Sequence, residues 1–132
     1  MSQPPPPLMN AHVITARAGL PGVTRLGAMH ASGFALGVDF GTSNTVAVAR
    51  TPDGRVRTLV VDGSPIVPSA VYAEPGTALL VGRDAILSSR LEPARFEPNP
   101  KRRIDDGDIL LGDREVPVAD LVAALLQRIH EE

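Results

Sequence analysis

Two apolar runs separated by a short polar turn constrain this chain more than any other feature of its sequence. The first run covers 34–38 and leads into Asp39, and the second covers 46–49, with the sequence Gly41-Thr42-Ser43-Asn44 between them. Short apolar runs bounded by turn residues are typical of buried strands. Gly41 allows a tight backbone turn that a side chain would block. The sequence therefore predicts a strand, a tight turn and a second strand.

The residues of this turn suit the binding of an anion. Successive backbone N–H groups in such a turn can converge on a negatively charged ligand. Asp39 stands at the end of the first strand, where a phosphate-bound cation would lie. Two other phosphate motifs are absent, because no glycine-rich segment precedes the single lysine, Lys101, and Gly37 and Gly41 do not form a dinucleotide fingerprint. The pattern predicts a nucleotide-phosphate site of a different type.

Composition excludes several classes of protein. The 132 residues are enough for one modest domain, and with 43% apolar but only 3% aromatic residues the core must be aliphatic. A net charge of −2 gives no electrostatic basis for binding nucleic acid or an anionic membrane. No apolar run approaches the length of a membrane span. The absence of cysteine excludes disulfides and thiolate catalysis, and it is compatible with the cytoplasmic location that we expect.

The chain divides into a leader and an ordered part. Residues 1–32 are rich in proline and glycine and are predicted to be disordered. Residues 33–132 are predicted to form an α/β fold with a mixed sheet that starts with an antiparallel three-strand meander. The expected strands cover 34–39, 45–50, 55–62, 70–73 and 78–81, followed by a helix over 82–89, a hairpin of 108–111 with 114–116, and an amphipathic helix over 118–130.

Four segments together resemble one protein family. The sequence GVDFGTSNT at 37–45 is similar to the first phosphate motif of the 70-kilodalton heat-shock chaperones, which belong to the actin, hexokinase and heat-shock ATPase superfamily. Three further segments resemble this family in the same order: IVPSAVY at 66–72, LVGRDA at 80–85 and KRRI at 101–104. The resemblance extends from about Gly33 to the end of the chain, and it implies the N-terminal part of a ribonuclease-H-like, actin-like ATPase lobe. In that lobe, 65–116 would form a small projecting subdomain.

The resemblance also implies roles for individual residues. Asp39 would hold the Mg²⁺ of ATP or ADP, through water. The backbone of Gly41, Thr42 and Ser43 would cradle the phosphates, and Asn44 would support the turn. Lys101 would reach the γ-phosphate and the attacking water, so that Lys101 and Asp39 are the expected catalytic residues. Lys101 is the one lysine beside 12 arginines, and its compact ammonium suits this position better than a guanidinium.

Three functions are compatible with these features. The first is a heat-shock-70-like chaperone ATPase, whose full-length form would have unfolded proteins and co-chaperones as partners. The second is another member of the superfamily, such as a sugar kinase or a filament-forming ATPase. The third is a non-catalytic nucleotide-binding or scaffold module. Because the sequence has no second phosphate loop, adenosine site or peptide-binding domain, we expect an N-terminal fragment without measurable ATPase activity of its own.

Overall fold

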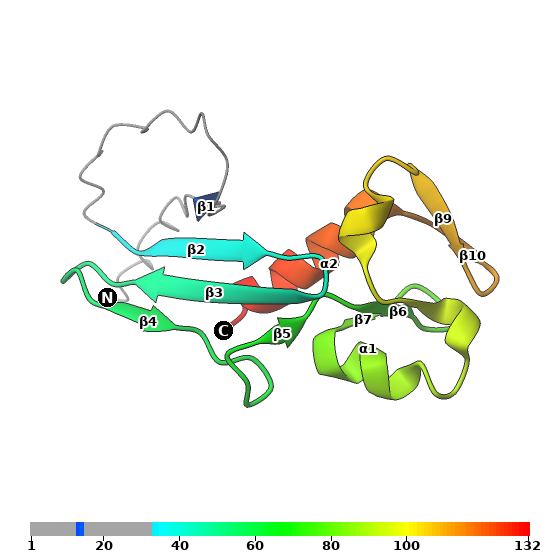
Figure 1. Cartoon of the computed structure of the whole chain (residues 1–132), viewed down its shortest axis with the longest axis horizontal. Coiled ribbons are helices and arrows are strands. Elements are labelled where there is room, and N and C mark those ends of the chain that lie inside the picture. The colour runs from blue at the N-terminus through cyan, green and yellow to red at the C-terminus, as the bar shows by residue number, and fades with distance from the viewer. Residues whose placement is uncertain (1–12, 15–32) are drawn as a thin grey trace, which may run out of the picture.

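The computed structural model describes residues 13–14 and 33–132, and its first sheet is built around an antiparallel meander (Figure 1). Strands β2 (Ala35–Phe40), β3 (Asn44–Arg50) and β4 (Val56–Thr58) pair in sequence order, which confirms the predicted meander. Strand β1 (Val13–Ile14) lies parallel to β2, and β5 (Val67–Pro68) pairs with the start of β3. The sheet is therefore mixed and has five strands.

The third strand is shorter than the sequence predicts. Strand β4 ends at Thr58 rather than continuing to Asp62, and Val61 instead forms an isolated bridge with Ser64. Between them, Asp62 and Gly63 both have positive φ values, 51° and 77°. An Asp-Gly pair is typical of a tight reversal that requires this backbone conformation. This reversal is a separate turn that follows the end of β4.

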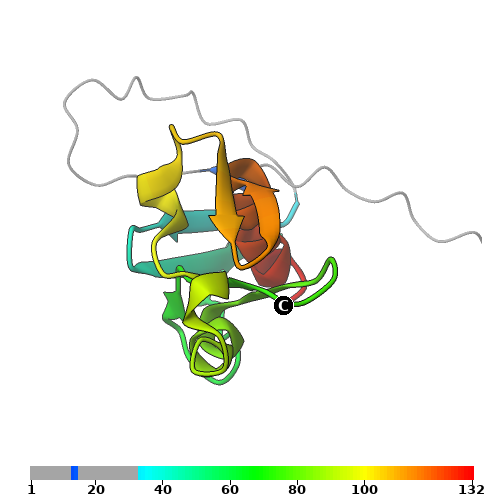
Figure 2. The same cartoon turned by 90° about the vertical axis from the view of Figure 1, so that its right-hand side faces the viewer.

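The elements that follow lie beyond the turn that joins β2 to β3 (Figures 1 and 2). A three-stranded sheet is formed by β6 (Val71–Ala73), β7 (Leu79–Val81) and β8 (Phe96–Glu97), with α1 (Gly82–Ser88) following β7. The predicted hairpin is confirmed. Its strands are β9 (Asp108–Leu111) and β10 (Arg114–Pro117). Two short 3-10 helices, η1 (Pro93–Arg95) and η2 (Pro100–Arg103), flank β8.

Helix α2 (Val118–His130) confirms the predicted amphipathic helix and provides much of the core. Its side chains Leu121, Leu125 and Ile129 are at most 1% exposed. They belong to one apolar cluster that also includes residues of β2, β3, β6, β7, β9 and β10. This cluster thus connects the five-stranded sheet to β6, β7, the β9–β10 hairpin and α2, while a second cluster of Ala70, Tyr72 and Ala85 packs α1. The fold is mixed α/β with antiparallel sheets.

Two sequence expectations concern the ends and the surface of the chain. Of the leader predicted to be disordered, 1–32, only Val13 and Ile14 are described, as strand β1, and the rest of this prediction lies outside the described residues.

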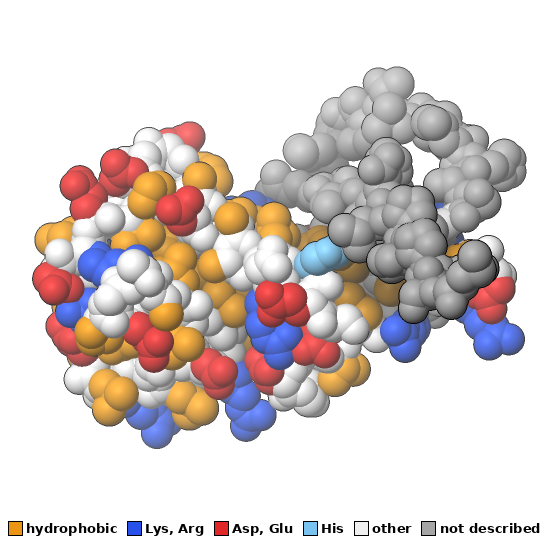
Figure 3. Space-filling view, turned by 180° about the vertical axis from the view of Figure 1, so that it is seen from behind, with side chains coloured by type: hydrophobic (Ala, Val, Ile, Leu, Met, Phe, Trp, Pro, Cys, Tyr) orange, Lys and Arg blue, Asp and Glu red, His pale blue; other side chains and the backbone are white. Residues whose placement is uncertain are grey.

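On the face shown in Figure 3, acidic and basic side chains are interspersed with apolar ones. This distribution agrees with the small net charge of −2.

Candidate functional site

The β2–β3 turn has the tight geometry that its glycine indicates. The Gly41 N–H donates a hydrogen bond of 3.0 Å to the Asn44 carbonyl oxygen. A Cβ atom at Gly41 would lie 2.3 Å from the same oxygen, closer than real Cβ contacts. Asp39 precedes this turn as an exposed residue of β2, next to the buried Val38. The turn therefore requires glycine at this position.

Ser69, which follows β5, holds the β2–β3 turn through hydrogen bonds to its carbonyls. Its hydroxyl donates to the Gly41 carbonyl at 2.9 Å, and its backbone N–H donates to the Ser43 carbonyl at 2.9 Å. The Ser69 hydroxyl also lies 2.8 Å from the hydroxyl of Thr45, the first residue of β3 after Asn44. Both hydroxyl-bearing residues are 0% exposed. One buried side chain thus joins the turn to the segment between β5 and β6.

Two further backbone carbonyls at the turn, those of Phe40 and Thr42, accept hydrogen bonds from residues in and just before η2. The Lys101 ammonium donates to the Phe40 carbonyl at 2.8 Å and lies 5.8 Å from the centre of the Phe40 ring, in reach of a cation–π contact. We assign the Asn99 amide with its nitrogen toward the turn, because only this orientation places its donors against carbonyl oxygens, and it then donates to the Thr42 carbonyl at 3.0 Å. The structure therefore brings Lys101 to the turn, 61 residues earlier in the chain.

The N–H groups of the turn differ in their availability. The Gly41 N–H is engaged by Asn44, so in this conformation Gly41 contributes its shape and not a free donor. Among the described residues, none accepts a hydrogen bond from the N–H of Thr42 or Ser43. Successive backbone donors without internal partners can bind an anion as a nest. The turn can therefore offer two adjacent donors to a phosphate group.

The charges around the turn suit a cation–phosphate pair. The Asp39 carboxylate makes no hydrogen bond or ion pair with any described residue, so it is available to a ligand. No cluster of three metal-binding side chains exists in the part of the chain that the structure describes. A lone carboxylate fits Mg²⁺, which commonly combines one or two carboxylates with phosphate oxygens and water. The residues present therefore fit Mg²⁺ only as part of a nucleotide complex.

Sequence reasoning missed two residues of this site, Ser69 and Asn99. Ser69 carried a weak signal, because its segment resembles a family motif, but nothing in the sequence assigned it a contact. Asn99 stands between Pro98 and Pro100, where no periodicity exists. A pocket of about 240 Å³ lies elsewhere, lined in part by Val61 and Arg83, and it includes none of the residues of the turn.

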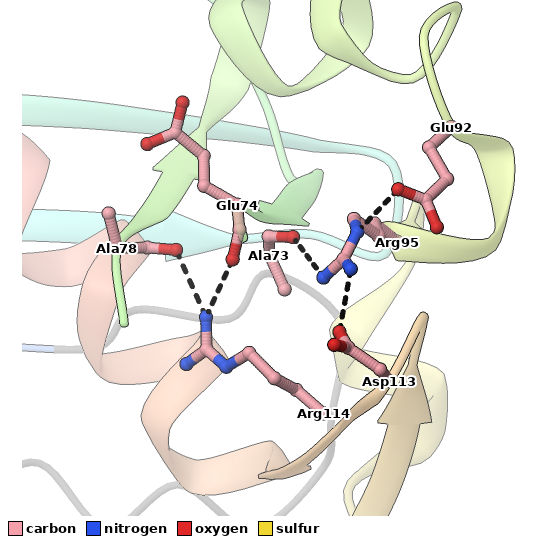
Figure 4. Close-up of polar contacts among 7 residues, drawn as sticks. All are labelled: Ala73, Glu74, Ala78, Glu92, Arg95, Asp113 and Arg114. Atoms are coloured by element: carbon pink, nitrogen blue, oxygen red, sulfur yellow. Dashed lines mark hydrogen bonds and ion pairs between the residues drawn. The ribbon is translucent and has the colours of Figure 1, made fainter. Parts of the chain in front are cut away.

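A second polar cluster, shown in Figure 4, holds parts of the fold together. The buried Arg95 pairs with Glu92 and with Asp113, each at 2.6 Å. The hydrogen bond that Arg95 donates holds the pKa of Asp113 below its usual value, and the hydrogen bonds that Arg95 donates to Glu92 and Asp113 raise its own pKa. Arg114 donates to the backbone carbonyls of the β6–β7 hairpin, those of Glu74, Thr77 and Ala78. These charges bind one another and attach the β9–β10 hairpin to its neighbours.

Comparison with known proteins finds relatives that are similar in sequence. The chain is similar to DnaK. Chaperone protein DnaK of Thermotoga neapolitana is 31% identical over 101 residues, which are 75% of this chain and 17% of that protein. The DnaK proteins of Thermotoga petrophila and Thermotoga maritima are 30% identical over the same length. The chain thus spans 17% of the length of these relatives of the heat-shock-70 class.

Two further comparisons add limits. No protein-family model matches the chain. Within the described ranges, no helix has the length and apolar character needed to cross a membrane. The similarity to DnaK is therefore a distant one, and it supports the relation to heat-shock-70 chaperones at the level of the class.

Proposed function

We propose that this chain is the nucleotide-binding part of a heat-shock-70-like chaperone ATPase, and that it binds Mg·ATP and Mg·ADP at the β2–β3 turn. The proposal rests on one observation: Lys101 contacts the β2–β3 turn, and the Thr42 and Ser43 N–H groups of that turn are available to bind a phosphate. The similarity to DnaK over 75% of the chain supports it. The same proposal includes a chaperone role with unfolded clients and co-chaperones, and a cytoplasmic location. It also includes the division of the chain into a leader of residues 1–32 and a nucleotide-binding domain of residues 33–132, within which 65–116 form a small subdomain.

Each residue of the turn has a distinct role in this proposal. The N–H groups of Thr42 and Ser43 bind phosphate oxygens, assisted by the Thr42 hydroxyl, while Gly41 and Asn44 keep the turn closed. Asp39 orients the water around Mg²⁺, and the bound ion neutralises phosphate charge. An ammonium has three donors, so Lys101 can keep its bond to Phe40 and still donate to the γ-phosphate.

Binding and hydrolysis place different demands on the protein. Phosphoryl transfer depends on positioning and charge stabilisation around the whole phosphate group. The described residues supply one side of such a site. We therefore expect the 132-residue chain to bind nucleotide without sustained hydrolysis.

Calorimetric titration of the chain with Mg·ADP and Mg·ATP tests the proposal. Asp39→Asn should weaken Mg·ADP binding by about tenfold or more, because it removes a charged contact. Asp105→Asn is the matched control, since it makes the same charge change at an exposed residue that forms no hydrogen bond or ion pair with the turn, and it should leave the affinity unchanged. Lys101→Met should weaken Mg·ATP more than Mg·ADP, because only ATP has the γ-phosphate.

The outcomes test the proposal against a non-catalytic nucleotide-binding module. No binding of either nucleotide at millimolar concentration would contradict the proposal. Mg·ATP affinity that is unchanged by Lys101→Met would favour a non-catalytic nucleotide-binding module. Steady ATP turnover by the chain that disappears in Asp39→Ala would show that one side of the site suffices for hydrolysis, against our expectation.

A further inference from the structure

We propose that Ser69 is a positioning residue that aims the Thr42 N–H of the β2–β3 turn at the phosphate, an inference that rests on the proposed function. Ser69 is 0% exposed, so it cannot touch a ligand itself. It acts through two hydrogen bonds to the turn, from its hydroxyl to the Gly41 carbonyl and from its N–H to the Ser43 carbonyl, each 2.9 Å long.

The planarity of the peptide group converts these bonds into an aim for the donors. In a trans peptide the C=O of one residue and the N–H of the next are fixed in one plane and point in opposite directions, and the described residues contain no cis peptide. Holding the Gly41 carbonyl toward Ser69 therefore directs the Thr42 N–H away from the protein interior. The Asn99 side chain does the same for the Ser43 N–H by holding the Thr42 carbonyl.

The direction of the proton on each hydroxyl follows from the partners. A carbonyl oxygen only accepts, so the Ser69 hydroxyl must donate its proton to Gly41. The Thr45 hydroxyl, 2.8 Å away, must then donate to Ser69. Thr45 thus supports Ser69 without contacting the turn carbonyls itself. Thr45→Val is therefore a suitable control. The substitution removes a buried hydroxyl that bonds to Ser69, but it leaves the hydrogen bond from Ser69 to the Gly41 carbonyl.

The test compares Ser69→Ala with Thr45→Val in the 132-residue chain. Both should lower the midpoint of thermal unfolding, because each removes a buried hydrogen bond. Only Ser69→Ala should weaken Mg·ADP binding, by about fivefold to tenfold. It should also lower the NMR order parameters of the Thr42 and Ser43 amides relative to those of β9 and β10. Equal Mg·ADP affinity of the two variants, with equally ordered turns, would overturn the proposal.

Two further measurements keep the result unambiguous. If Ser69→Ala does not fold, Ser69→Cys replaces it with a side chain of similar size and a weaker donor, and its Mg·ADP affinity should fall below that of Thr45→Val. If the unaltered chain does not bind Mg·ADP, the proposed function fails, and the order parameters of the ligand-free turn still decide the role of Ser69. A turn that stays as ordered in Ser69→Ala as in the unaltered chain contradicts that role.

Discussion

Gly41 shows how much a single residue determines at this site. A methyl group there would lie 2.3 Å from the Asn44 carbonyl oxygen, which is a backbone atom and cannot move without changing the turn. We expect Gly41→Ala to break the 3.0 Å hydrogen bond from Gly41 to Asn44. The free energy of unfolding in urea should fall by about 1–3 kcal/mol, and Mg·ADP binding should weaken.

The matched control is Ser43→Ala, at an exposed residue of the same turn. It removes a side chain and keeps the backbone N–H, so stability and Mg·ADP binding should change little. If Gly41→Ala unfolded at the same urea concentration as the unaltered chain, the clash at Gly41 would not limit the turn.

The residues of the site differ in how far they could be predicted from the sequence. Gly41 was predictable, because a tight turn between two apolar runs requires glycine. Ser69 and Asn99 were not, because their partners are backbone carbonyls. Every residue has a carbonyl group, so such a contact leaves no complementary side chain in the sequence. Only a resemblance to a family could indicate the segment around Ser69.

At the scale of elements, the β9–β10 hairpin makes a charged contact that responds to pH. Arg95, through its hydrogen bond, lowers the pKa of Asp113 relative to the unfolded chain. A lowered pKa means that this contact stabilises the fold above the usual aspartate pKa of about 3.9. The contribution is lost as the pH falls through the lower, folded-state pKa. Because Asp113 is 78% exposed, solvent screening makes the effect small.

Urea unfolding of Asp113→Asn between about pH 7 and pH 2 measures this contribution. The variant should lose less stability than the unaltered chain on acidification, because it has no carboxylate there to protonate. Asp108→Asn, at the other end of the same hairpin, is the control. Parallel pH profiles for Asp113→Asn and the unaltered chain would show that the Arg95 contact adds nothing to stability.

The elements that the sequence predicted well have strong local patterns. Helix α2 has apolar residues at helical spacing, and the β9–β10 hairpin surrounds Gly112 and Asp113. Strands β5 and β8 have two residues each and adjoin prolines, so neither has a period that could be recognised. Their pairing partners, β3 and β6, are distant in sequence and determine their conformation. Tertiary contact, rather than local preference, forms these two strands.

At the scale of the whole molecule, one apolar cluster joins the five-stranded sheet to β6, β7, the β9–β10 hairpin and α2, and a second, smaller cluster packs α1 through Ala85. Leu121 and Leu125 of α2 share an apolar cluster with Val38 of β2 and Val116 of β10. The candidate site lies at the boundary between the five-stranded sheet and the later elements, where Ser69 and Lys101 both reach the turn. Its geometry is thus a property of the assembled fold.

The long separations in sequence between the turn and its supports have a consequence for the order of folding. The carbonyls of Gly41 and Phe40 meet partners 28 and 61 residues further along the chain. Closing such loops costs more entropy than closing a hairpin, so contacts of this kind form late. In refolding followed by pulse-labelled hydrogen exchange, the Ser69 amide, which donates to the Ser43 carbonyl, should become protected after the amides of β9 and β10. Earlier protection of Ser69 would contradict this order of folding. If protection is late, a chain emerging from the ribosome completes its candidate nucleotide site only after Lys101 has been synthesised.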